Sequence, residues 1–189
     1  METTLIVPSH VRSAATLAAR SPALEGELHL ESDVSALCAM TDFRREYPIT
    51  IEANVSIDEA FADMKRLQVH ALIVVPQDSD SLDICVLGLI TSYDISKERP
   101  HRSISAQVTE IRRYRTVGEV MTAWNDLTLI KYASLQALTA KGIYELFKGT
   151  GLTHLLVVED RGNESAVAIG LLSRSMLAKR LQGAENMRS

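Results

Sequence analysis

The first residues to consider for chemistry are a hydroxyl and a carboxylate three positions apart, at Thr91 and Asp94. They follow the apolar run 84–90, where a strand would end and a helix would begin. A Ser/Thr-x-x-Asp pattern is typical of a helix start, because the two side chains satisfy backbone N–H groups that have no partner in the helix. The same side chains can also contact a bound ligand, and the sequence leaves both interpretations open.

No pattern in the sequence points to catalysis or to a metal. The chain lacks the nucleophile elbow, the Walker phosphate loop and the zincin motif, so no enzymatic activity is expected. The segment Gly149-Thr150-Gly151 has no following lysine, and we interpret it as a helix stop. His70 and His154 precede apolar strands and are interpreted as cleft-lining or partly buried neutral side chains, and not as catalytic bases. The five histidines show no metal-ligand spacing, which predicts no metal site.

Composition excludes several classes of protein. A net charge of −4 over 189 residues does not indicate a nucleic-acid binder. No apolar run approaches the roughly 20 residues that cross a bilayer, and we expect a cytoplasmic protein without membrane association. Cys85 lies in an apolar run and is expected to be buried; with Cys38 it forms no disulfide framework. The basic stretch 97–115 is interpreted as solvated surface, with an anionic ligand or partner as the alternative.

An internal repeat organises the chain. Three segments recur in the same order about 82 residues downstream: 39–43 as 120–124, 71–75 as 154–158, and 88–91 as 170–173. Around them, hydrophobic periodicity predicts strand, helix, strand, strand and helix in each copy. The first copy has strands at 49–51, 72–75 and 84–90 and helices from Ser56 and Tyr93; the second has strands at 130–133, 155–158 and 166–172 and helices from Thr139 and Ser175.

The predicted fold is therefore α/β, with two β-α-β-β-α repeats. Continuous apolar strands are covered on both faces, so we expect the copies to pack through their sheets about a pseudo-two-fold axis. The predicted division is an N-terminal extension (1–35), repeat 1 (36–100), a linker (101–116), repeat 2 (117–183) and a C-terminal tail (184–189). The extension is expected to pack onto the repeats or onto a partner subunit.

Three segments carry a resemblance to a known family. Thr116–Thr122 is similar to its lead-in, Val69–Val75 to its central strand, and Gly88–Ile95 to its tail motif, Gly-h-h-Thr/Ser-x-x-Asp-h, where h is apolar. The ordered, repeated set resembles a tandem pair of cystathionine-β-synthase-type (CBS) domains, also called a Bateman module. The resemblance spans approximately residues 36–182.

The resemblance implies an adenine nucleotide (AMP, ADP or ATP) in clefts between the repeats. The tail hydroxyl, Thr91, would contact phosphate at a helix N-terminus, and Asp94 would accept hydrogen bonds from the ribose hydroxyls. The opposite repeat would contribute Ala133, Thr153 and His154. Ala133 stands where the family often has threonine, on what we expect to be the first strand of the second copy.

A second cleft would use Ser173 and Arg174 of the second tail with Thr50 and His70 of the first repeat. Met176 stands at the position that matches Asp94, so this cleft has no ribose carboxylate and is expected to be the weaker site.

The function that these features favour is a non-enzymatic, energy-sensing regulatory module that requires no cofactor. The resemblance also implies a homodimer that acts on an unidentified partner protein. The alternative is a ligand-free dimeric interaction scaffold with vestigial clefts. Binding of nucleotide by the purified protein separates the two.

Overall fold

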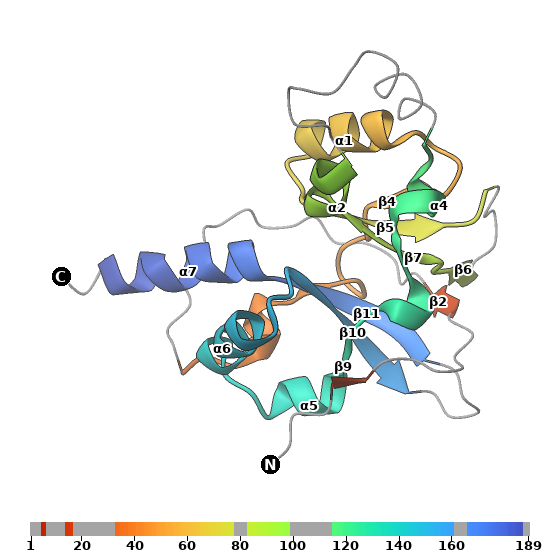
Figure 1. The fold of residues 1–189 in the computed structure, drawn as a ribbon. Helices are drawn as coiled ribbons and strands as arrows, with labels where there is room; N and C mark the ends of the chain where they lie inside the picture. Colours follow the sequence, from red (N-terminus) through yellow and green to blue (C-terminus); the bar gives the residue numbers. More distant parts are fainter. Residues whose placement is uncertain are drawn as a thin grey trace. The chain divides into compact units, whose positions relative to one another are not determined.

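The computed structural model describes residues 5–6, 14–16, 33–77, 83–98, 115–160 and 166–186. The chain forms two compact units (Figure 1). Pro48–Leu127 make up one unit, here called the central unit. Met1–Tyr47 and Thr128–Ser189 together make up the other, here called the terminal unit. The basic stretch 97–115 lies outside the described residues, apart from positions 97–98 and 115.

The central unit contains a four-stranded sheet of order β4-β5-β7-β8. Strand β4 runs parallel to β5, and the other neighbours are antiparallel. Its elements are β4 (Thr50–Glu52), α1 (Ile57–Arg66), β5 (Ala71–Val75), β6 (Asp83–Cys85), β7 (Gly88–Thr91), α2 (Ser92–Glu98), α4 (Val117–Val120), β8 (Thr122–Ala123) and the 3-10 turn η2 (Trp124–Asp126). Figure 1 shows α1 and α2 together on one side of these strands.

Helix α1 begins where the sequence predicts. The Ser56 side chain caps it by accepting the Glu59 N–H at 3.2 Å. Carboxylates occupy its first turn and cations its last, as the helix dipole favours. Ile57, Ala60 and Met64 pack into a buried cluster with the sheet. Leu67, at the same helical spacing, follows the last helical turn and is 39% exposed.

The terminal unit contains a five-stranded sheet of order β1-β9-β10-β11-β3. Its elements are β1 (Leu5–Ile6), β2 (Ala14–Thr16), η1 (Ala36–Ala39), β3 (Thr41–Asp42), β9 (Leu129–Lys131), α5 (Tyr132–Gln136), α6 (Ala140–Thr150), β10 (His154–Asp160), β11 (Ala166–Ser173) and α7 (Arg174–Asn186). Strand β1 pairs with β9, so these two residues of the N-terminal extension join a repeat, as expected.

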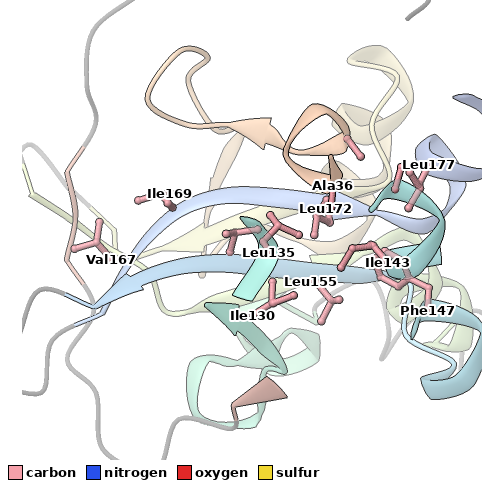
Figure 2. Close-up of a cluster of buried hydrophobic side chains, with 13 residues drawn as sticks. Ala36, Ile130, Leu135, Ile143, Phe147, Leu155, Val167, Ile169, Leu172 and Leu177 are labelled. Carbon is pink, nitrogen blue, oxygen red and sulfur yellow. The ribbon is translucent and has the colours of Figure 1, made fainter. Parts of the chain in front are cut away.

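The core of the terminal unit lies between its helices and one face of its sheet. Ile143 and Phe147 of α6 are fully buried with Leu155, Leu172 and Leu177, and Figure 2 shows this cluster. The helix is delimited as the sequence predicts. Thr139 accepts the Gly142 N–H at 3.1 Å at the start, and Gly151 ends the helix in the left-handed conformation with φ 71°.

The two sheets have equivalent pairings, and each takes its last strand from the lead-in of the other repeat. Strand β8, from the lead-in of repeat 2 (residues 116–124), pairs with β7. Strand β3, from the equivalent lead-in of repeat 1 (residues 39–43), pairs with β11. Gly88 and Gly170 occupy matching positions in these pairings, opposite Ala123 and Asp42. The compact units therefore cut across the predicted boundaries 36–100 and 117–183, because β7 and β11 find their edge partner in the other copy.

The first strand of the second copy differs from the prediction. Strand β9 ends at Lys131, and Ala133 is an exposed residue of α5, a helix that the sequence did not predict. Thr50 is paired with Ile73, and the residue in the equivalent pairing is Leu129, opposite Leu156. Since Leu129 is 2% exposed, the structural counterpart of Thr50 is a buried apolar residue and not Ala133.

The predicted strand 84–90 is interrupted. It forms β6 and β7, and β6 is not part of the central sheet. Cys85, the last residue of β6, is exposed, so the prediction that it is buried was wrong. None of the described helices has the length and apolar character of a membrane span.

Candidate functional site

Asp94 is held in a fixed position at the start of α2. The Thr91 hydroxyl donates to Oδ2 of Asp94 at 2.6 Å, and the Thr91 N–H donates to the same oxygen at 3.0 Å. In return, the Asp94 N–H donates to Oγ1 of Thr91 at 3.2 Å. The pair therefore forms the helix cap that the sequence pattern predicts.

The sheet positions this pair. Thr91 is the last residue of β7 and lies opposite Ala71, the first residue of β5. The next residue, Ser92, donates its N–H to the carbonyl of His70 at 2.9 Å. Thr91 is 7% exposed, whereas Asp94 is half-buried, so Asp94 is the more accessible residue of the pair.

Part of the Asp94 carboxylate stays free for a ligand. A carboxylate has about four lone-pair positions, and Thr91 occupies two of them, both on Oδ2. Among the described residues, Oδ1 of Asp94 accepts no hydrogen bond. The cap and a ligand contact are therefore compatible: one oxygen holds the helix start, and the other keeps its acceptor capacity.

The two other central-unit residues that the sequence assigned to a cleft lie apart from each other. His70 is exposed and adjoins the Thr91 pair through its carbonyl. Thr50 is an exposed residue of β4, which lies on the other side of β5 from β7. Within this unit the structure brings Thr91, Asp94 and His70 together.

The tail motif of repeat 2, in the terminal unit, lies among a different set of polar groups. His154 lies opposite Ser173 in the sheet, and the Arg174 N–H donates to the Thr153 carbonyl at 2.9 Å. Oγ1 of Thr153 and Nδ1 of His154 are 3.1 Å apart. Ser173 and Ser175 share a hydrogen bond of 3.1 Å between their hydroxyls. Thr153, His154, Ser173 and Arg174 thus lie together in one unit.

The two tails have opposite hydrogen-bonding character. The Asp94 tail presents a carboxylate, which accepts hydrogen bonds from a ligand. At the matching position of α7 stands Met176, 39% exposed, and the first turn of that helix has no acidic residue. With its hydroxyls and Arg174, the second tail mainly offers donors. These differences agree with the sequence-based ranking of the two tails, which stays a prediction for binding.

Each predicted cleft combines residues of both units. The Asp94 cleft would join Thr91 and Asp94 of the central unit to Ala133, Thr153 and His154 of the terminal unit. The second cleft would join Ser173 and Arg174 of the terminal unit to Thr50 and His70 of the central unit. The structure places Ala133 on the exposed surface of α5, away from the strand on which it was expected. The assembly of the two sets into clefts stays a prediction.

Within the terminal unit, Asp42 and Arg44 form a local ion pair that the sequence did not indicate. Arg44 donates from its Nε and a terminal nitrogen to the two Asp42 oxygens, each at 2.8 Å, and lies 4.8 Å from the centre of the Tyr132 ring. The hydrogen bonds from Arg44 lower the pKa of Asp42 below its usual value of 3.8, against a smaller effect of burial. Asp42 likewise raises the pKa of Arg44. The sequence shows only the short Asp-x-Arg spacing. It could not show the contact with Tyr132, because Arg44 and Tyr132 lie far apart along the chain.

No group of three or more histidine, cysteine or acidic side chains with the arrangement of a metal site occurs among the described residues. The candidate site is the Asp94 carboxylate, which the hydroxyl and the N–H of Thr91 orient.

Comparison with known proteins agrees with this architecture. The family model of the CBS domain matches residues 39–101. No curated protein matches the chain in sequence. A CBS-domain-containing protein from Agrobacterium tumefaciens has a similar structure, with 19% identity and a TM-score of 0.52 over 85% of this chain and 98% of that protein.

Two further solved structures contain adenine nucleotides. CBSX2, in complex with AMP, is 17% identical with a TM-score of 0.51, covering 82% of this chain and 99% of that one. The CBS domain of a bacterial CNNM/CorC-family Mg²⁺ transporter, in complex with ATP, is 13% identical with a TM-score of 0.51, covering 80% and 89%. At these identities the similarity establishes the fold.

Proposed function

We propose that this protein, which carries a CBS domain and has the fold of CBS-domain proteins, is a regulatory module that binds an adenine nucleotide of the AMP, ADP or ATP class. The observation that carries the proposal is the carboxylate of Asp94, which Thr91 orients through one oxygen while the other keeps its acceptor capacity. The structures of CBSX2 with AMP and of the transporter CBS domain with ATP support this class of ligand.

The chemistry of the site matches a ribose. The two vicinal hydroxyls of a ribose are two donors, and Asp94 keeps two lone-pair positions after its bonds to Thr91. Hydrogen bonds to an ionised acceptor contribute about 1.5–3 kcal/mol each, more than neutral ones. Because the carboxylate is already oriented, binding loses little additional side-chain entropy.

The proposed action is regulation without chemical turnover. A ligand that contacts one arrangement of the protein better than another shifts the population toward that arrangement, and a partner protein can respond to the change. The proposal includes such a partner, whose identity the contacts do not indicate.

A thermal-shift series with AMP, ADP, ATP and S-adenosylmethionine tests the proposal. A ligand at 100 times its Kd stabilises the native state by about 2.7 kcal/mol, so the melting temperature rises by several degrees. The Asp94→Asn variant replaces a charged oxygen but keeps a side chain of the same shape, and it should lose most of the shift. If no ligand at millimolar concentration moves the melting temperature of the wild-type protein, the proposal is wrong.

The alternative, a dimeric interaction scaffold, has one supporting observation. Tyr93 of α2 is 57% exposed, and Leu67 at the end of α1 is 39% exposed, so two adjoining helices of the central unit carry exposed apolar side chains. We propose a homodimer through helical surfaces for both functions. Light scattering at micromolar concentration tests the dimer, and a dimer mass without any nucleotide-dependent thermal shift would favour the scaffold.

A further inference from the structure

The two sheets differ at one edge. In the terminal sheet, β1 lies along the outer side of β9, with Leu5 opposite Ile130 and Ile6 opposite Leu129. In the central sheet, the equivalent strand is β4, and it is the last strand of the sheet. Among the described residues, no strand pairs with the outer side of β4. One sheet therefore has its edge covered, and the other has the same edge open.

The backbone of β4 has hydrogen-bonding groups for a further strand. The Ile49 carbonyl accepts the Ile73 N–H at 3.0 Å, and the Ala53 N–H donates to the Val75 carbonyl at 3.1 Å, so these two residues bond to β5. Because backbone groups alternate in direction along a strand, the N–H and the carbonyl of Thr50 are directed to the outer side. A residue opposite Thr50 in an antiparallel strand can exchange two hydrogen bonds with it.

The side chains along this edge are accessible. Ile49 is 37% exposed, Thr50 is exposed and Glu52 is half-buried. Pro48 has no N–H and limits the edge on its N-terminal side, so the edge suits a short segment. Glu52 stands where β9 has Lys131, so the two equivalent edges have opposite charge at this position.

Strand β1 indicates which kind of segment this edge accepts. It comes from outside the repeats and places two consecutive aliphatic residues, Leu5 and Ile6, beside β9. In that antiparallel register, the residue before Leu5 comes opposite Lys131. When the same register is applied to β4, the corresponding residue comes opposite Glu52. A cation there forms a cross-strand pair of opposite charge, which stabilises a sheet.

We propose that the outer side of β4 is a docking edge for an extended segment of a partner protein, in which a lysine or arginine precedes two aliphatic residues. The segment adds an antiparallel strand to the central sheet, with its cation opposite Glu52 and its second aliphatic residue opposite Thr50. Main-chain hydrogen bonds provide the affinity, and alternate side chains provide the specificity. The chain's own extension has Thr4 in place of the cation, so a second copy fits this edge less well. This inference goes beyond the proposed function and does not depend on a nucleotide.

A short synthetic peptide with the central sequence Ser-Lys-Leu-Ile-Ser tests the docking edge in the absence of nucleotide. We expect a Kd below about 1 mM in a titration followed by NMR. The amides of Thr50 and Glu52 should shift and become protected from hydrogen exchange. Those of Leu129 and Lys131 should not respond, because β1 already covers that edge. A peptide with proline in place of isoleucine lacks the N–H that meets Thr50 and should not bind.

Two variants test the edge and its register. Thr50→Pro removes an outward N–H without removing a hydrogen bond to β5, and it should weaken the peptide at least about fivefold. Glu52→Lys should shift the preference between this peptide and one with glutamate in place of lysine by about two- to fivefold toward the glutamate peptide. Glu59→Lys is the matched control, because it makes the same change of charge on exposed α1 and should leave the preference unchanged.

Several results would overturn the inference. No binding at millimolar peptide would do so, and so would amide shifts at Leu129 and Lys131 in place of Thr50 and Glu52, which would show that the peptide displaces β1. Protection of the Thr50 amide that rises with protein concentration in the free protein would make a second copy the occupant. A preference that Glu52→Lys leaves unchanged would contradict the register. None of these results bears on the thermal-shift test of nucleotide binding.

Discussion

Met40 lies against Gly170 so closely that its sulfur occupies the space in which a β-carbon on that glycine would stand. The relationship recurs in the central unit, where the carbonyl of Thr122 and the side chain of Met121 crowd Gly88. Both glycines begin or lie within the tail motif, and both methionines belong to a lead-in. The repeated Met-Thr and Gly-Leu sequences are therefore two sides of one contact, made twice with exchanged partners.

This contact predicts that Gly170→Ala is destabilising. The new methyl group would displace Met40 and the backbone of Thr41, and such overpacking costs about 1–3 kcal/mol. Gly149→Ala is the control, because this exposed residue of α6 has no atom near its potential β-carbon. Alanine there should stabilise the helix by about 0.5–1 kcal/mol. Urea denaturation measures both changes, and a neutral Gly170→Ala would contradict the close contact.

The exchange of lead-ins also predicts which fragment of the chain folds. Residues 48–127 contain β8 and α4, with the fully buried Val117, whereas residues 36–100 lack both. We expect the 48–127 fragment to show a cooperative thermal transition, and the 36–100 fragment to be less protected in hydrogen exchange because β7 has lost its edge partner. If 36–100 were the better-folded fragment, the predicted repeat boundaries would describe the folding unit and the compact unit would not.

Much of this architecture could be predicted from local sequence. The repeat, the caps at Ser56 and Thr139, the stop at Gly151 and the Thr91–Asp94 pair all depend on residues within a few positions of one another. The exchange could not be predicted, because β3 and β8 are two residues long, too short for any periodicity, and their partners lie far along the chain.

The mistaken position of Ala133 has a simple physical cause. A constant offset of about 82 residues matches Thr50 to the region of Ala133. The segment between the first strand and the central strand is, however, four residues longer in the second copy, counted from Leu129 to His154 and from Thr50 to Ala71. The second copy contains the additional helix α5 in this segment, so its first strand lies earlier than the offset implies. Only the strand pairing reveals this.

The Asp42–Arg44 pair predicts a pH-dependent contribution to stability. Because the folded pKa of Asp42 lies below its ordinary value of 3.8, the pair stabilises the protein fully above that value, and the contribution disappears as the pH falls through the folded pKa. Both side chains retain solvent contact, so we expect Asp42→Asn to cost about 0.5–1 kcal/mol at pH 7. The difference from wild type in urea denaturation should narrow below pH 4.

Asp63→Asn is the matched control for this prediction. Asp63 pairs with Arg66 on the exposed face of α1, where both side chains are more exposed than Asp42. Its removal should change stability by less than about 0.5 kcal/mol. An equal loss in both variants would show that the contact with Tyr132 adds nothing to the Asp42–Arg44 pair.

The two nucleotide tails can be tested by removing a group from each. Asp94→Ala should reduce adenine-nucleotide affinity at least about tenfold, because it removes charge-assisted hydrogen bonds to the ribose. Ser173→Ala should do much less, since one neutral hydroxyl contributes about 0.5–1.5 kcal/mol and Ser173 already pairs with Ser175. Calorimetry measures both. Abolished binding in Ser173→Ala with unchanged binding in Asp94→Ala would reverse the assignment.

Met176→Asp supplies the missing carboxylate to the second tail. Met176 is 39% exposed in the first turn of α7, where no acidic residue stands, so an aspartate meets no packing cost and interacts favourably with the helix dipole. Stability should rise by about 0.3–1 kcal/mol on that account alone. The new side chain stands three residues after Ser173, with the spacing of Asp94 after Thr91, so the same reciprocal cap can form.

If the absent carboxylate is what weakens this tail, calorimetry on Met176→Asp should give a higher stoichiometry of adenine nucleotide per chain than the wild-type protein. Met176→Asn is the control, because it can cap the helix without the charge that strengthens the hydrogen bonds to a ribose. A variant that gains stability but keeps the wild-type stoichiometry would show that the second tail lacks more than a carboxylate. The buried Leu129, which is the structural counterpart of Thr50, would not explain that result. The predicted second cleft uses Thr50 of the central unit, whereas Leu129 belongs to the terminal unit, as the second tail does.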